Sequence, residues 1–232
     1  MKMSFVVPCL NEEKNIRDTI NEILKVTKFR VFSDYEIIIV DDGSTDKTYL
    51  EIKNLMKNEK ISSLRHKKNI GFGGAYKSGL KLSTGDYVIM VPGDNAHSSN
   101  EILKIIKLFG KADIIIPYTN SIGERNILRF LLSKTFTLII NSLFFLNVKY
   151  YNGLVLHKGN LIRDINIDTN GFAYQVFALV TLIKKGASVF NVQIEVKERK
   201  SGKSSALKFK NIIEVLLSIV KLRLKFLKIN LK

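Results

Sequence analysis

The chain has 232 residues, of which 46% are hydrophobic and 25% are charged, and its formal net charge is +16. This composition excludes a disordered chain, and the length suits one large domain or a domain with a small accessory piece. The charge indicates an anionic partner, namely nucleic acid, an acidic membrane surface or a phosphorylated substrate. The single cysteine, Cys9, excludes an intrachain disulfide and fits a reducing cytosol.

Apolar segments of two kinds alternate in the first 120 residues. Five short runs predict strands at 5–7, 37–40, 61–64, 87–91 and 114–116. Helical spacing and helix-start signals predict helices between them at 12–26, 48–56, 70–82 and 98–109. Strands that are apolar on both faces and alternate with helices are typical of a mostly parallel sheet. We therefore expect an α/β fold over this region.

The pattern changes in the second half of the chain. The predicted elements there are a Phe-rich helix at 126–146, a helix at 171–185, a strand at 189–196 and a tail helix at 207–227. The segment 197–232 holds eleven Lys or Arg and two Glu, so the tail is strongly basic. No segment has the roughly 20 apolar residues of a membrane span, and we find no signal-peptide pattern. We divide the chain into a domain at 1–205 and a basic amphipathic helix at 206–232.

Polar residues follow three of the predicted strands. Glu12 comes after the first strand, Asp41 and Asp42 after the second, and Asp94 after the fourth. Ligands of open α/β sheets bind beyond the carboxyl ends of the strands, where these side chains should converge. Gathered carboxylates fit Mg²⁺ or Mn²⁺ that shares its ligands with a diphosphate. The alternative is that Asp94 only shapes the turn that follows Pro92.

Four segments in order resemble the family 2 glycosyltransferases. They read VVPCLNEE at 6–13, IVDDGSTD at 39–46, NIGFGGA at 69–75 and GDYVIMVPGD at 85–94. Two later segments are similar to motifs of the dolichol- and polyprenyl-phosphate sugar transferases within that family. They read YNGL at 151–154 and ERKSGKS at 198–204. The resemblance covers most of the chain.

The resemblance implies a GT-A fold, which is a Rossmann-like fold, with C-terminal amphipathic helices, a GDP- or UDP-linked sugar donor and transfer with inversion at the anomeric carbon. The donor-binding residues that it implies are Pro8, Leu10, Glu12, Val40, Asp42, Gly93 and Asp94. Asp94 matches the last acid of the family's Asp-x-Asp motif, which makes it the expected ligand of Mg²⁺ or Mn²⁺ and a catalytic residue. Pro92 stands where the first acid of that motif would be.

Three basic residues are candidates for contacts with phosphate. A departing nucleoside diphosphate gathers negative charge, which a cation would stabilise. Arg199 is the leading catalytic candidate for this task, with Lys203 behind it, and Arg129 is a candidate for the phosphate of the acceptor. The alternative for Arg199 and Lys203 is a solvated basic loop.

For the glycines at 69–75 and for two of the three histidines, the sequence predicts structural roles. Gly71, Gly73 and Gly74 resemble a dinucleotide-binding fingerprint only loosely. They predict a tight turn with close helix packing. His97 either contacts donor or acceptor or is a structural polar residue. The other two histidines have no companions at metal-ligand spacing and are predicted to be structural; they are His66 and His157.

The acceptor is inferred from a missing acid. Hydroxyl-acceptor relatives tend to carry an acidic pair at the start of the helix after the acceptor loop, and the comparable segment here, GFAYQ at 171–175, has none. A phosphate needs no general base, because it is already ionised at neutral pH. We therefore favour a polyprenyl-phosphate acceptor, with a hydroxyl of a surface polysaccharide or lipid-linked glycan as the alternative. Asp168 lies near enough in sequence to serve as a base.

The basic helices predict where the protein acts. The helix at 126–146 and the tail helix are expected to lie on an anionic membrane, peripherally on the cytoplasmic face of the cell membrane. Core packing, a homodimer interface or a membrane-protein partner are alternatives for these surfaces. A nucleic-acid-binding module is a distant alternative, because the tail has only Phe209 and Phe226 to stack on bases. We therefore predict no nucleic-acid partner.

Overall fold

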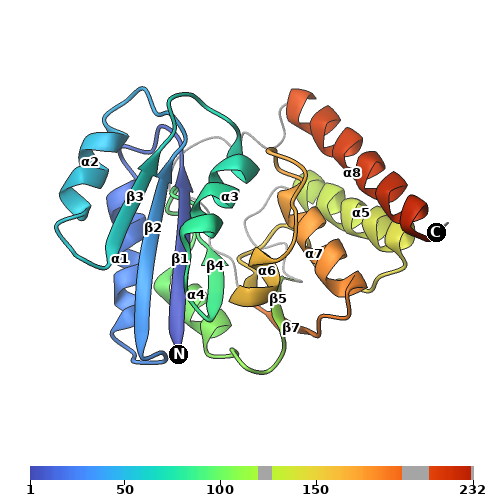
Figure 1. Cartoon of the computed structure of the whole chain (residues 1–232), viewed down its shortest axis with the longest axis horizontal. Coiled ribbons are helices and arrows are strands. Elements are labelled where there is room, and N and C mark those ends of the chain that lie inside the picture. The colour runs from blue at the N-terminus through green and yellow to red at the C-terminus, as the bar shows by residue number, and fades with distance from the viewer. Residues whose placement is uncertain (120–126, 195–208, 231–232) are drawn as a thin grey trace.

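The computed structural model describes residues 1–119, 127–194 and 209–230, although not the side chains of 128, 129, 209, 210 and 228–230. Its strands are β1 Lys2–Cys9, β2 Asp34–Asp41, β3 Ile61–Arg65, β4 Tyr87–Met90, β5 Ile114–Tyr118, β6 Leu156–Lys158 and β7 Val189–Gln193. In the described residues they form one seven-stranded sheet in the order β3-β2-β1-β4-β6-β5-β7 (Figure 1). Every pairing is parallel except those of β6, which runs antiparallel to β4 and β5. The carboxyl ends of β1, β2, β3, β4, β5 and β7 therefore share one edge.

Helices cover both faces of the sheet. Their bounds are α1 Ile16–Thr27, α2 Thr48–Leu55, α3 Phe72–Leu82, α4 Ser99–Ile106, α5 Ile127–Phe144, α6 Gly159–Arg163, α7 Tyr174–Lys184 and α8 Phe209–Asn230. Buried side chains of α1, α2 and α4 join one core cluster, and those of α3, α5, α7 and α8 join a second. In β1, Phe5 and Val7 belong to the first cluster and Val6 to the second. The central strands are thus buried on both faces, as their apolar runs predicted.

The α/β prediction is confirmed, and the differences from it are local. The first helix begins at Ile16 rather than at residue 12, and the turn before it is closed by the N–H groups of Asn15 and Ile16, which donate to the carbonyl of Glu12 (3.0 and 2.9 Å). The structure adds β6 and α6, which were not predicted. A three-residue strand is too short to show a period in the sequence. The predicted strand at 189–196 is described only as far as 194.

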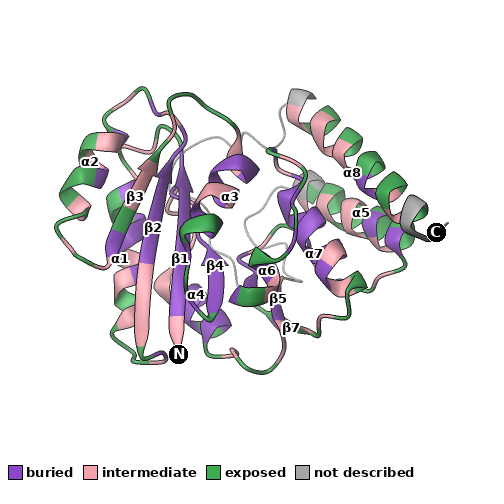
Figure 2. Ribbon diagram, viewed as in Figure 1, coloured by how far each residue is buried: buried purple, intermediate pink, exposed green. Residues whose placement is uncertain are grey.

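The helix α8 has two apolar stripes. Its inward stripe, which contacts the second core cluster, consists of Val215, Ile219, Leu222 and Phe226. Its outward stripe is between 41% and 65% exposed (Figure 2) and consists of Ile212, Ile213, Leu216, Leu217, Val220, Leu224 and Leu227. In the part of the chain that the structure describes, no helix combines the length and apolar character that crossing a bilayer requires.

A buried histidine sits in the middle of the sheet. His157 on β6 lies between Val88 of β4 and Ile114 of β5, and it is 3% exposed. Among the described residues, its Nδ1 has no hydrogen-bond partner. Burial lowers the pKa of His157 to about 3. Because an unfolded chain binds this proton near pH 6.5, the unfolded state holds more protons between these two pKa values, and the protein should lose stability as the pH falls through this window.

We expect the free energy of unfolding to fall by about 2 kcal/mol more in the parent than in His157→Leu between about pH 7.5 and about pH 5. The leucine removes the titrating group and places an apolar side chain at this buried position of the sheet. Urea unfolding of both proteins at the two pH values measures the difference. Parallel losses in parent and variant would show that His157 does not carry the acid sensitivity.

Candidate active site

The loops that follow β1 and β2 are joined by hydrogen bonds. The N–H of Asn11 donates to Ser44 Oγ (2.9 Å), that of Thr45 donates to Asn11 Oδ1 (2.9 Å), and that of Glu12 donates to Thr48 Oγ1 (2.7 Å). Asn11 has φ 55°, in the left-handed region that asparagine tolerates better than most residues. The two loops therefore form one continuous wall at the carboxyl edge of the sheet.

Asp41 ties this wall to β3. Its Oδ1 accepts the N–H of Ser44 (2.8 Å), and its Oδ2 lies 3.1 Å from Nε of Arg65, the last residue of β3. The Arg65 guanidinium also stacks on the ring of Tyr49, 4.3 Å from the ring centroid. The Asp41 side chain is buried, so its role is to hold the loop after β2 and the end of β3 together.

Asp42 holds the loop that leads into α3. Its Oδ1 accepts the N–H of Ile70 (3.0 Å) and its Oδ2 accepts the N–H of Gly71 (3.0 Å). The Nδ1 of His66 lies 2.7 Å from Asp42 Oδ1, and its Nε2 lies 3.0 Å from Ser78 Oγ of α3. Both ring nitrogens of His66 are thus engaged, in line with its predicted structural role. The contact of Asp42 with a donor stays a prediction, because both carboxylate oxygens already accept hydrogen bonds from the chain.

Gly93 allows the turn after β4 to approach the end of β1. Its N–H donates to the carbonyl of Pro8 (3.0 Å), and a β-carbon at position 93 would lie 2.7 Å from Cβ of Cys9. Any side chain would push the two strand ends apart. Gly93 therefore sets how closely Asp94 sits to the wall described above.

Asp94 is partly buried in the turn that Gly93 begins. Its Oδ1 accepts the N–H of Ala96 (3.2 Å), and the N–H of Asn95 donates to Thr19 Oγ1 of α1 (2.9 Å). Asn95 has φ 52°, so the chain turns sharply here. These contacts place the Asp94 carboxylate at the carboxyl edge, where the sequence predicted it.

Acids make this edge electrically negative. Burial raises the pKa of the Cys9 thiol far above its ordinary value, and four carboxylates raise it further; they are Asp41, Glu12, Asp46 and Asp42. Carboxylate oxygens at a negative edge fit a hard divalent cation. Among the described residues, no group of three or more His, Cys, Asp or Glu side chains could hold a metal ion. An ion at Asp94 would thus take further ligands from donor phosphates.

The remaining predicted donor contacts differ in accessibility. Leu10 is 37% exposed at the edge, and Glu12 is partly buried, with its Oε2 accepting Nδ2 of Asn15 (2.7 Å). Pro8 and Val40 are buried as neighbours in the register of β1 and β2. Their side chains thus lie beneath the surface that a donor would touch.

A cationic pocket lies at the same edge, beyond β5. It has a volume of about 60 Å³ and is lined by Thr119, Phe130, Ser133, Lys134, Thr137, Lys149 and Tyr150. Thr119 directly follows β5, and four of these residues lie on α5. Two ammonium groups among hydroxyls are suited to an anion. Lys149 was not predicted, because only the fold brings it next to α5.

The other predicted cations are not seen in this pocket. Arg129 lies in α5, but its side chain is outside the described part of the chain, and Arg199 and Lys203 lie in the segment 195–208, which is also outside it. Their contacts with phosphate stay predictions.

The glycines at the start of α3 bring it against the segment before α7. A β-carbon at Gly73 would lie 2.5 Å from the carbonyl oxygen of Gly171, and the N–H of Gly74 donates to the carbonyl of Asn170 (3.0 Å). The rings of Phe72 and Phe172 stack across this contact with centroids 5.5 Å apart. The close packing predicted for these glycines is confirmed, and its partner is the segment before α7.

The helix α8 supplies an acid to that segment. A β-carbon at Gly171 would lie 1.9 Å from Oε1 of Glu214, so the carboxylate fills the space beside this glycine. Asp168 pairs with Lys221 of α8 (2.9 Å). The local sequence at 171–175 lacks an acid, but the fold brings one there from α8, 43 residues after Gly171. Only the position of α8 reveals it.

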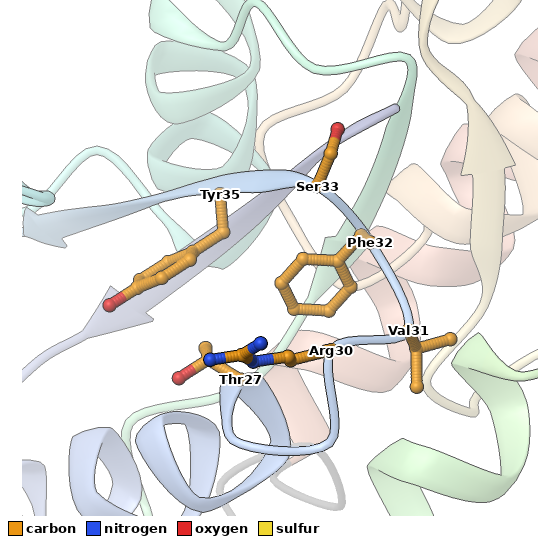
Figure 3. Close-up of a pocket in the computed structure, with 6 residues that line it drawn as sticks. All are labelled: Thr27, Arg30, Val31, Phe32, Ser33 and Tyr35. Carbon is orange, nitrogen blue, oxygen red and sulfur yellow. The ribbon is translucent and has the colours of Figure 1, made fainter.

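A larger surface pocket lies away from these residues. It has a volume of about 530 Å³ and is lined by Thr27, Arg30, Val31, Phe32, Ser33 and Tyr35 (Figure 3). These residues connect the end of α1 to the start of β2, at the amino ends of the strands. Because open α/β sheets bind ligands at the opposite edge, we place the active site at the carboxyl edge despite the smaller pocket there.

The sheet order and the helices on both faces define an α/β fold of the GT-A class. A crystal structure of glucosyl-3-phosphoglycerate synthase from Mycobacterium tuberculosis, in complex with Mn²⁺, uridine diphosphate and phosphoglyceric acid, has the same fold. It superposes with a TM-score of 0.73 at 17% identity, over 96% of this chain and 78% of that one.

The family model for glycosyl transferase family 2 matches residues 4–168, so the chain belongs to this family and is a glycosyltransferase. An uncharacterised protein of Methanocaldococcus jannaschii is 28% identical over 94% of this chain and 98% of its own length. Dolichyl-phosphate beta-glucosyltransferase of Dictyostelium discoideum is 26% identical over 97% of this chain and 75% of its own length. The human enzyme of that name is 34% identical over 46% of this chain and 35% of its own length.

Proposed function

We propose that the protein transfers a sugar from a GDP- or UDP-linked donor to a polyprenyl-phosphate acceptor at an anionic membrane surface, with inversion at the anomeric carbon. The observation that carries this proposal is the pairing of two sites on one sheet edge: the acidic turn at Asp94 and the cationic pocket beyond β5. The names of the Dictyostelium and human relatives support a lipid-phosphate acceptor.

The donor would lie along the wall formed by the loops after β1, β2 and β4. Mg²⁺ or Mn²⁺ held at Asp94 would neutralise the charge that builds on the departing nucleoside diphosphate. Glu12 and Asp42 shape the nucleotide side of this wall. Arg199 would add a positive charge to the leaving group, with Lys203 as the second candidate.

The acceptor phosphate would enter the pocket between α5 and β5. Lys134 and Lys149 would hold its oxygens, with Arg129 as a further candidate, and one ionised oxygen would attack the anomeric carbon as its bond to the diphosphate breaks. No general base is needed for this step. The outward stripe of α8 and exposed apolar residues of α5, such as Leu131 and Leu138, would rest in the lipid from which the acceptor comes.

A hydroxyl acceptor is the second candidate, because Glu214 supplies an acid at the start of α7. A carboxylate there could take the proton of a sugar hydroxyl, as a general base does. In the first candidate the same carboxylate only stabilises the positive end of the α7 dipole. Removing its charge should abolish turnover if it is a general base and should have little effect if it only stabilises the helix.

An acceptor comparison separates the two candidates. Purified protein with Mn²⁺ or Mg²⁺ is given UDP- and GDP-sugars and either polyprenyl phosphate or a lipid-linked glycan, and nucleoside diphosphate release and glycosylated lipid are measured. We expect turnover with polyprenyl phosphate, a rise of about 10- to 100-fold in its KM in Lys149→Ala, and less than about a twofold change in kcat in Glu214→Gln. Lys104→Ala, on the exposed face of α4, is the matched control.

The opposite result is equally clear. Turnover only with the glycan, lost by about 10²-fold or more in Glu214→Gln, would support the hydroxyl acceptor and contradict the phosphate acceptor. Release of no nucleoside diphosphate with any donor and acceptor pair would contradict both.

A further inference from the structure

The turn after β4 carries a histidine that the proposed transfer reaction does not yet use. His97 lies three residues after Asp94, and its Nδ1 is 3.0 Å from Oε1 of Glu101 in the first turn of α4. The Glu101 side chain is 3% exposed and that of His97 is 19% exposed. The ring is therefore held against a buried carboxylate, and the His97 side chain stays partly exposed.

This contact fixes which ring nitrogen is available. A carboxylate beside Nδ1 accepts a hydrogen bond from the N–H at that position, which leaves the lone pair on Nε2. Among the described residues, the His97 side chain has a hydrogen bond at Nδ1, to Glu101, and none at Nε2. Histidines that ligate metals commonly show this arrangement, in which a carboxylate orients the ring through its other nitrogen.

The surroundings hold Asp94 and His97 in one short turn. The N–H of Asn95 is bound to Thr19 of α1, the N–H of Ala96 is bound to Asp94, and the N–H of Glu101 donates to Ser98 Oγ (3.4 Å) at the start of α4. Both ends of the turn are thus anchored to helices. The turn provides one carboxylate for a divalent ion, because proline occupies position 92.

We propose that Nε2 of His97 is a second protein ligand of the divalent ion at Asp94, and that Glu101 is the positioning residue that orients it. The inference rests on the proposed function, in which such an ion serves the donor diphosphate. An imidazole ligand favours transition-metal ions over Mg²⁺, which takes oxygen ligands. The chain would therefore bind Mn²⁺ more tightly than Mg²⁺, by an amount that depends on His97.

Mn²⁺ binding tests this without an activity assay. Electron paramagnetic resonance measures Mn²⁺ affinity in the presence of UDP or GDP, and electron spin echo modulation detects nitrogen bound directly to the ion. We expect nitrogen modulation in the parent, its loss in His97→Ala with Mn²⁺ affinity lowered about 10- to 100-fold, and its retention in Glu101→Gln with affinity lowered about 10-fold. Competing Mg²⁺ should bind the parent and His97→Ala within about threefold of each other.

Because the chain has few histidines, a nitrogen modulation signal can be assigned to one of them. The chain has three histidines, and both nitrogens of His66 are engaged by Asp42 and Ser78. His157→Gln is the matched control, because His157 is buried in the sheet, and it should keep the nitrogen signal. A thermal melt confirms that each variant is folded, and the parent spectrum alone already decides whether nitrogen binds the ion.

Two negative results have different meanings. Mn²⁺ that binds the parent and requires Asp94 but shows no nitrogen modulation would overturn the role of His97 and leave the proposed function standing. Absence of Mn²⁺ binding with either nucleotide would overturn both the ligand assignment and the metal-assisted transfer.

Discussion

Replacing Asp94 with asparagine is expected to lower the rate of sugar transfer by about 10³-fold while the protein stays folded. Asparagine keeps the size of the side chain and can still accept the N–H of Ala96 through its amide oxygen. It removes the negative charge with which the protein would bind a divalent cation at the diphosphate. The loss should appear mainly in kcat and in the metal concentration that gives half-maximal rate.

The measurement is nucleoside diphosphate release at increasing Mn²⁺, together with a thermal melt. Asp164→Asn is the matched control, since Asp164 is an exposed acid that pairs with Lys185 (3.2 Å) far from the turn after β4. Asp94→Asn activity within about tenfold of the parent, with an unchanged metal requirement, would show that Asp94 is not the metal ligand.

The second large effect is expected at the outward stripe of α8. The double variant Leu217→Glu with Leu224→Glu should bind anionic lipid vesicles at least about 100-fold more weakly than the parent, because each buried leucine contributes about 1.5–3 kcal/mol. These side chains are 65% and 53% exposed, and in the described part of the chain neither belongs to a core cluster. Added salt should also weaken binding of the parent, since exposed Lys221 and Lys225 lie on the same helix.

Co-sedimentation with vesicles that contain phosphatidylglycerol measures this effect. Leu50→Glu is the matched control, because Leu50 is 56% exposed on α2, on the other side of the molecule (Figure 1). Equal loss in the control would show a general effect of added charge. A lipid-free parent that elutes as a dimer, with the double variant as a monomer, would instead assign the stripe to a second copy of the chain.

Much of the fold followed from local patterns. The apolar runs at 37–40 and 87–91 predicted buried strands, and the structure has β2 and β4 there. The antiparallel β6 was missed, because three residues carry no period and its partners β4 and β5 come from distant parts of the chain. Asp42 and Asp94 each follow a predicted parallel strand, and this position predicted that they share an edge of the sheet. It gave no information on what each side chain contacts.

In the candidate active site too, the sequence predicted positions along the chain but not the contacts between side chains. Asp94 lies in the predicted turn, whereas the contacts of Asp42 with His66 and Gly71 emerge only when the loop before α3 returns to the edge. Glu214 does not show in the local sequence at 171–175, because its carboxylate reaches Gly171 from another helix.

The amino-acid sequence by itself determined the α/β class, the family resemblance and the edge of the sheet that carries the acids, because each of these depends on residues close together along the chain. The tertiary structure decided which side chains meet: Lys149 beside α5, Glu214 beside Gly171, and the outward stripe that α8 leaves uncovered. The physical reason is that side-chain periods arise from local backbone geometry, whereas contacts between distant segments depend on how all the helices pack on the sheet.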